Sequence, residues 1–135
     1  MTITKVGLIG AGLMGHGIGK NIVTKGYALK VMAHRNRAPV ESLLALGATE
    51  GATPAEIAAG CDLVILCVTG SPQVESIIYG EHGLAFAERP GLIIADCSTA
   101  EPHATIRIAA DLAKHGVHFL DTPLTRTPRE AEAGK

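Results

Sequence analysis

The sequence has little of what marks several large classes of protein. It contains no tryptophan, and aromatic residues make up only 3% of its 135 residues, so its core must be aliphatic. It has no excess of basic residues, since 12 Lys and Arg accompany 13 Asp and Glu, and this balance argues against a nucleic-acid partner. The longest apolar run lies near residues 63–68 and is far shorter than the ~20 residues that span a bilayer, so no membrane partner is expected.

Cysteine is scarce, and its number is odd. The three cysteines do not supply the even framework of a disulfide-stapled secreted domain. No basic segment leading into an apolar segment, the pattern of an export signal, is visible in the sequence. We therefore predict a reduced, cytoplasmic protein. The six histidines are scattered along the chain, and because their spacing matches no metal-ligand pattern, no metal is predicted.

The residues that are present favour one folded α/β domain. Hydrophobic residues make up 47% and charged residues 19% of the chain, a balance typical of a folded protein. Short apolar runs alternate with longer amphipathic stretches, which predicts a doubly wound parallel sheet of the Rossmann type. The predicted strands cover residues 5–9, 28–33, 63–68, 92–95 and 117–120, and the predicted helices cover 13–25, 38–46, a segment from 54, 71–79 and 102–115.

A G-x-G-x-x-G motif, Gly10, Gly12 and Gly15, joins the first predicted strand to the first predicted helix. In this context the motif is typical of a dinucleotide site. Gly10 allows the tight turn, Gly12 lets a pyrophosphate approach the backbone, and Gly15 lets the helix pack closely on the strand. The helix N-terminus offers unpaired N–H groups to the phosphates. The alternative is a tight turn that binds no ligand.

The end of the second predicted strand bears on which dinucleotide binds. An NAD site usually has Asp or Glu at this point to bind the ribose 2′-hydroxyl, whereas this chain has His34, Arg35 and Arg37. Because the planar guanidinium fork suits a phosphate, we predict NADP, with NAD as the alternative. A solvated basic turn, or a carboxylate that reaches the ribose from elsewhere, also fits the sequence.

Four segments resemble the β-hydroxyacid dehydrogenases, the family that includes 3-hydroxyisobutyrate dehydrogenase, tartronate semialdehyde reductase and 6-phosphogluconate dehydrogenase. The glycine motif, with Leu13 and Met14 between its second and third glycines and Asn21 after it, is similar to the opening of that family. Residues 61–68 with Ser-Pro-Gln-Val at 71–74 are similar to its fourth strand and the following loop. Residues 94–102 resemble its D-x-S-T…P segment, and residues 119–124 resemble its F-x-D-A-P-V strand.

The resemblance assigns roles to residues at the ends of the predicted strands. It places Leu13 and Met14 with the glycines at the cofactor, Val68 and Thr69 along the cofactor, and Thr99 near the nicotinamide. These residues follow strand ends, which is where doubly wound sheets bind ligands. For Thr99 alone, an N-cap before Pro102 is the alternative role.

The chain departs from the family at the segment that holds the substrate. The family follows D-A-P-V with S-G-G, a cradle for the substrate carboxylate, whereas this chain has Thr125, Arg126 and Thr127. The resemblance therefore implies that these three residues bind a small anionic substrate. The alternative for Arg126 is a surface position facing solvent or Glu130.

In the family a lysine, helped by an asparagine, handles the hydroxyl proton, and both lie on a helix after the dinucleotide domain. No lysine of this sequence matches that position, so we name no catalytic residue. We expect a dinucleotide-binding domain at 1–124 and, at 125–135, a truncated substrate loop that leads to a helical domain absent from this sequence. By resemblance the full-length protein is a homo-oligomer through that domain, and the 135 residues alone are inactive.

The leading hypothesis is thus the NADP-binding domain of an oxidoreductase. The full-length enzyme would transfer a hydride between a nicotinamide cofactor and a small anionic β-hydroxyacid or its semialdehyde. The alternative is a non-catalytic dinucleotide-binding sensor or interaction module. A methyltransferase or flavoprotein could use the same glycine turn but would not account for the later D-x-S-T and D-x-P segments.

Overall fold

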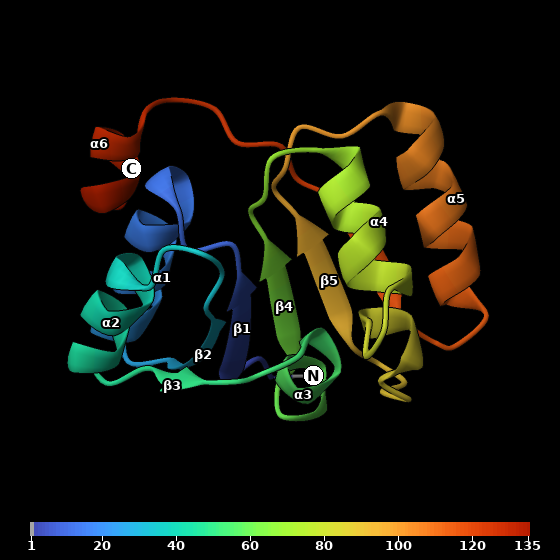
Figure 1. The fold of residues 1–135 in the computed structure, drawn as a ribbon, viewed down its shortest axis with the longest axis horizontal. Coiled ribbons are helices and arrows are strands. Elements are labelled where there is room, and N and C mark those ends of the chain that lie inside the picture. Colours follow the sequence, from blue (N-terminus) through green and yellow to red (C-terminus); the bar gives the residue numbers. More distant parts are fainter. Residues whose placement is uncertain (1) are drawn as a thin grey trace.

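The computed structural model describes residues 2–135 and contains one sheet of six parallel strands (Figure 1). The strand order is β3-β2-β1-β4-β5-β6, which confirms the predicted doubly wound sheet. The strands are β1 (Lys5–Ile9), β2 (Ala28–Met32), β3 (Thr49–Glu50), β4 (Leu63–Leu66), β5 (Ile93–Asp96) and β6 (His118–Asp121). The helices are α1 (Leu13–Thr24), α2 (Ala38–Ala45), α3 (Pro54–Ala59), α4 (Ser71–Tyr79), α5 (Pro102–Ala113) and α6 (Pro128–Glu132), with a 3₁₀ turn at Leu84–Phe86.

Helices cover both faces of the sheet, because alternate strand residues point to opposite sides. On β4, Val64 and Leu66 join the core beneath α3, α4 and α5, whereas Leu63 and Ile65 pack against the core beneath α1 and α2. Both cores are built from Ile, Leu, Val and Ala with one cysteine. This agrees with the scarcity of aromatic residues in the sequence.

The direction of the strand order reverses at β1. The chain runs from β1 to β2 and β3 on one side and then returns to β4 on the other side, which leaves a crevice at the carboxyl ends of these strands. β1 pairs with β2 on one side and with β4 on the other, and Ile9 lies level with both Met32 and Leu66. The loops that follow these three strands therefore emerge side by side. In open α/β sheets such a switch point is where ligands bind.

Several element bounds differ from the sequence-based predictions. β3 was not predicted, because two residues that pair with Lys30 and Val31 carry no periodic signal. β4 ends at Leu66 rather than 68, because the N–H of Val68 turns to the Ser98 hydroxyl at 2.9 Å. The helix starting at residue 54 is confirmed, with the Thr53 hydroxyl accepting from the N–H of Glu56 at 3.2 Å.

The polar C-terminal segment contains a helix that was not predicted. α6 is five residues long, and Thr127 and Glu130 form a capping box at its start. After β6 the chain crosses the sheet edge and brings α6 back against α1, the red and blue helices of Figure 1. Within residues 2–135, no helix combines the length and apolar character needed to cross a membrane.

Candidate dinucleotide site

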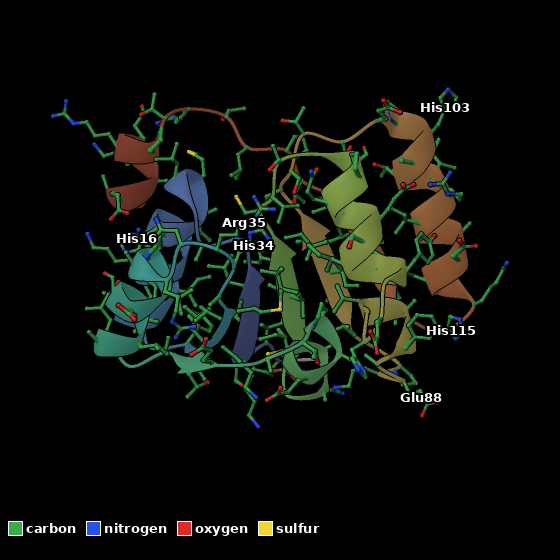
Figure 2. The ribbon with its side chains drawn as sticks, viewed as in Figure 1. His16, His34, Arg35, Glu88, His103 and His115 are labelled. Atoms are coloured by element: carbon green, nitrogen blue, oxygen red, sulfur yellow. The ribbon has the colours of Figure 1, made fainter. Side chains whose placement is uncertain are left out.

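A cavity of about 640 Å³ opens at the carboxyl ends of β1, β2 and β4. Its volume lies within the ~300–1,000 Å³ typical of ligand pockets. The loop after β1, the loop after β2, the loop after β4 and one side of α4 line it. His34 and Arg35 lie close together above the ends of the central strands (Figure 2). The fold thus places the crevice where the glycine motif predicted it.

The three motif glycines meet different constraints. A Cβ atom at Gly10, whose φ is +104°, would lie 2.1 Å from the carbonyl oxygen of Cys67, and one at Gly15 would lie 1.8 Å from the carbonyl oxygen of Gly10. Both glycines are therefore required by the packing of the chain itself. At Gly12 no atom of the other described residues, apart from its two chain neighbours, lies within 4 Å of such a Cβ. A dinucleotide phosphate close to the backbone at this place would account for the glycine at position 12.

The helix α1 begins at this cavity, because its N-cap residue, Gly12, lines it. Gly12 is the N-cap, no side chain of the described residues caps the helix, and its first turn has no acidic residue. Both features suit an anion. Leu13 is 83% exposed beside Gly12. Met14 instead lines a second cavity of about 290 Å³ on the far side of α1, together with Thr125.

The basic loop after β2 divides into two parts. His34 and Arg35 are exposed and line the large cavity. Arg37 does not line it, because its guanidinium forms two parallel bonds to the Glu50 carboxylate, at 2.9 and 3.1 Å. The hydrogen bond from Arg37 lowers the pKa of Glu50, and the same pair raises the pKa of Arg37. The sequence predicts both arginines at the cofactor, whereas in the structure Arg35 lines the cavity and Arg37 pairs with Glu50.

The loops after β4 and β5 are joined by buried polar contacts. Val68 and Thr69 line the large cavity. Ser98 is 3% exposed, and its hydroxyl accepts from the N–H of Val68 at 2.9 Å. The N–H of Ser98 donates to Asp96 Oδ1 at 2.9 Å. Ser98 is thus a supporting residue that sequence reasoning missed, although a serine two residues beyond a buried Asp was a usable signal.

Thr99 is exposed and lies outside the lining of the large cavity. Its carbonyl oxygen lies 3.5 Å from the position of a Cβ at Gly70, so its loop runs beside the loop that carries Thr69. The N-cap of α5 is Glu101, and no side-chain hydrogen bond caps that helix within the described chain. The alternative role of Thr99 as an N-cap is therefore wrong.

The predicted substrate loop lies against α1. Thr125 lines the smaller cavity with Met14. Arg126 has a φ of +75°, and its guanidinium lies 3.8 Å from the Glu130 carboxylate. The Thr127 hydroxyl forms the α6 cap. The structure therefore joins Thr125 to the cofactor helix and gives Arg126 and Thr127 partners within their own segment.

Sequence reasoning also missed the contacts that hold α6 in place. The side-chain amide of Asn21 donates to the carbonyl oxygens of Gly17 and Ala131, both at 2.8 Å. Glu132 pairs with His16 and, at 3.2 Å, with Lys20. In the sequence, Asn21 is marked only by its place in the segment that resembles the family's opening, which does not indicate what its side chain contacts. Its function depends on a partner more than 100 residues away.

Comparison with known proteins agrees with this geometry. Residues 5–135 match the model of a family described as the NAD binding domain of 6-phosphogluconate dehydrogenase. The chain belongs to this family. The predicted relationship to the β-hydroxyacid dehydrogenases is therefore confirmed, and with it a nicotinamide-dinucleotide-binding domain.

Curated relatives place this NAD-binding domain in proteins of different kinds. The chain is 34% identical to 2-hydroxy-3-oxopropionate reductase of Escherichia coli over 122 residues, which are 90% of the chain and 41% of the reductase. It is 32% identical to the cytokine-like nuclear factor N-PAC of Xenopus tropicalis over 124 residues, which are 92% of the chain and 23% of that protein. The chain thus spans less than half of either relative.

A solved structure shows how closely the NAD-binding domain keeps its fold. The 3-hydroxyisobutyrate dehydrogenase of Salmonella typhimurium superposes with a TM-score of 0.89 at 28% identity. The match covers 97% of this chain and 45% of that one.

Proposed function

We propose that this chain is the NADP-binding domain of an oxidoreductase that acts on a small anionic β-hydroxyacid or its semialdehyde. The observation that carries the proposal is the cavity at the switch point, which combines open space at Gly12 with a guanidinium at Arg35. When bound, the nicotinamide cofactor supplies the hydride chemistry. The residues of this chain supply binding and orientation.

Each part of the cavity suits one part of the dinucleotide. The N–H groups at the start of α1 and the bare backbone of Gly12 would hold the pyrophosphate. Arg35, with His34 beside it, would meet the 2′-phosphate through a planar fork of donors. The carboxylate that lines the cavity, Glu81, follows α4 rather than β2. The described residues that line the cavity directly after β2 include no Asp or Glu, the residue types that bind the ribose in an NAD site.

Cofactor affinity tests this assignment on the 135-residue chain. NADPH and NADH are titrated by calorimetry, and NADPH should bind more tightly. Arg35→Ala should weaken NADPH roughly tenfold or more and leave NADH nearly unchanged, because only NADPH carries the extra phosphate. Arg107→Ala is the control, since Arg107 pairs with Glu75 on the outer helices. Equal affinities for the two cofactors in the native chain would refute the choice of NADP.

The substrate proposal rests on the loop that packs against α1. Thr125 lines the cavity that Met14 also lines, and Arg126 follows it in the loop. The pair between Arg126 and Glu130 is long and half-exposed, and such a pair is weak enough for a substrate anion to replace. Saturation-transfer NMR with NADPH present should show binding of sulfonated or dicarboxylic aldehydes and not of neutral glyceraldehyde. Equal signals from charged and neutral aldehydes would contradict an anionic substrate.

Turnover should require residues beyond these 135. No lysine in this chain matches the family's catalytic position, so hydroxyacid oxidation by the isolated chain should be undetectable in an NADPH absorbance assay. Measurable turnover would show that a proton-transfer group lies within residues 1–135. Assembly through a further helical domain is part of the same proposal.

A second candidate function is a non-catalytic dinucleotide-binding module. It is favoured by the 32% identity to N-PAC, a protein named as a nuclear factor rather than as an enzyme. The segment encoded after Lys135 separates the two functions. A helical segment with a lysine and an asparagine on one face supports the dehydrogenase, and a segment without them supports the binding module.

A further inference from the structure

Glu50 and Arg37 form a salt bridge at the rim of the dinucleotide cavity. Arg37 Nη1 lies 2.9 Å from Glu50 Oε1, and Arg37 Nη2 lies 3.1 Å from Glu50 Oε2. Both oxygens of one carboxylate are thus paired with both ends of one guanidinium, the strongest arrangement for such a pair. Arg37 Nε also lies 3.7 Å from Glu41 Oε1. Arg37 therefore has two carboxylate neighbours, one held tightly and one loosely.

The sheet itself puts Glu50 in this place. β3 is two residues long, and its Glu50 pairs with Val31 of β2. The carboxylate therefore lies beside the loop that leaves β2. Arg37 follows Arg35 by two residues, a span of at most ~7 Å of chain, yet Arg35 lines the cavity and Arg37 does not. Asn36, which lies between the two arginines, also lines the cavity, so the loop holds Arg37 next to the lining residues while its guanidinium pairs with Glu50.

We infer that Glu50 is a specificity-determining residue of the cofactor site, because it withholds Arg37 from the 2′-phosphate. This inference rests on the proposed NADP-binding function. With Arg37 held, the guanidinium that lines the cavity at the end of β2 is that of Arg35. Removing the charge of Glu50 frees a second guanidinium within reach of the same phosphate, so the native chain binds NADPH less tightly than its two arginines allow.

Charge-neutral variants of the carboxylates test the inference by calorimetry on the 135-residue chain. Glu50→Gln should tighten NADPH binding roughly three- to tenfold and change NADH binding by less than about twofold. Glu41→Gln removes the same charge from the looser neighbour of Arg37 and should change neither affinity by more than about twofold. An equal gain for both cofactors in Glu50→Gln, or no gain, would overturn the inference.

Two Arg37 variants test whether the gain in NADPH affinity comes from the freed guanidinium of Arg37 or only from the loss of one negative charge. The double variant Arg37→Ala with Glu50→Gln should lose the gain, since no guanidinium is left to be freed. A gain that persists in this variant would overturn the inference. Arg37→Ala alone should leave NADPH affinity within about twofold of native, whereas a loss as large as that of Arg35→Ala would show that Arg37 already contacts the phosphate. Circular dichroism confirms that each variant is folded.

The outcomes also separate this inference from the proposed function. If the native chain binds NADPH and NADH equally, the choice of NADP fails. In that case, a Glu50→Gln variant whose affinity rises for NADPH but not for NADH would still support the inference that Glu50 withholds Arg37 from the 2′-phosphate. If the native chain prefers NADPH and Glu50→Gln changes nothing, the inference alone fails.

Discussion

Asn21, in the last turn of α1, donates a hydrogen bond to the carbonyl oxygen of Ala131, 110 residues later, at 2.8 Å. The same amide donates to the carbonyl oxygens of Gly17 and Glu132. At Gly17 a Cβ atom would lie 2.6 Å from the carbonyl carbon of Ala131, so the backbones of α1 and α6 are in direct contact. The side-chain amide of Asn21, and the close backbone contact that Gly17 permits, thus hold α6 against α1.

Replacing Asn21 should release α6 without unfolding the sheet. Every residue of α6 is at least partly exposed, so polar contacts rather than burial hold it. Asn21→Ala should speed amide exchange at 128–134 by roughly tenfold, the loss expected from one or two hydrogen bonds. Hydrogen-exchange mass spectrometry measures this. Thr24→Ala is the control, because that hydroxyl donates within α1 to the Asn21 carbonyl. Unchanged exchange at 128–134 in Asn21→Ala would show that other contacts suffice.

Alanine substitutions at the three motif glycines should have different effects: at Gly10 and Gly15 they should reduce stability, and at Gly12 they should reduce cofactor affinity. Gly10→Ala and Gly15→Ala should each lower the free energy of unfolding by about 3 kcal/mol or more, because the new methyl group meets a backbone oxygen. Gly12→Ala should change it by less than about 1 kcal/mol, because the space there is open. Gly12→Ala should nevertheless weaken NADPH roughly tenfold or more by blocking the pyrophosphate. Urea unfolding and calorimetry provide the two measurements, and a folded Gly12→Ala chain with native affinity would contradict the prediction.

Ser98 should affect the cofactor through the loop it supports. Ser98→Ala leaves the N–H of Val68 without its buried partner and should reduce stability by about 1–3 kcal/mol. NADPH affinity should fall as well, because Val68 and Thr69 line the cavity. Ser71→Ala is the matched control: its hydroxyl also accepts from a backbone N–H 30 residues away, that of Glu101, but at an exposed position. If both variants behave alike, burial of the Ser98 bond is not what matters.

The pKa values of two aspartates are shifted in opposite directions, so their contributions to stability should depend on pH in opposite ways. Burial raises the pKa of Asp96, whose Oδ2 has no hydrogen-bond partner among the described residues. Hydrogen bonds from the N–H groups of Thr4 and Lys5 lower the pKa of Asp62. A raised folded-state pKa means that Asp96 destabilises the fold as pH rises above about 4, the unfolded value. The lowered pKa of Asp62 means that its contribution is present above about 4 and is lost as pH falls through the folded-state pKa.

The Asn variants measure these two contributions. As pH rises from about 4 toward 7, Asp96→Asn should gain in stability relative to the native chain. Asp62→Asn should be less stable than the native chain above about pH 4, and this deficit should shrink as pH falls below about 4. Urea unfolding at several pH values on both sides of about pH 4 gives both differences. If the stability difference between Asp96→Asn and the native chain does not change with pH, Asp96 has the same pKa in the folded and unfolded chain.

Much of the fold could be predicted from the sequence because its signals are local. The apolar run at 63–68 and the glycine turn at 10–15 depend on neighbours a few residues apart, and both lie where they were expected. β3 and α6 were missed for the opposite reason. β3 is two residues whose strand conformation comes from pairing with β2, and α6 is a short polar helix held by its contacts with α1.

The sequence by itself determined the doubly wound sheet, the family and the loops around the crevice, since these follow from periodicity, motif and order along the chain. Only the tertiary structure decided which of those residues share a surface. Arg35 faces the cavity while Arg37 pairs with Glu50 from another strand, and Ser98 reaches back 30 residues to Val68. The physical reason is that charge pairing and buried hydrogen bonds depend on distances in space, which residues far apart in the sequence acquire only when the sheet has formed.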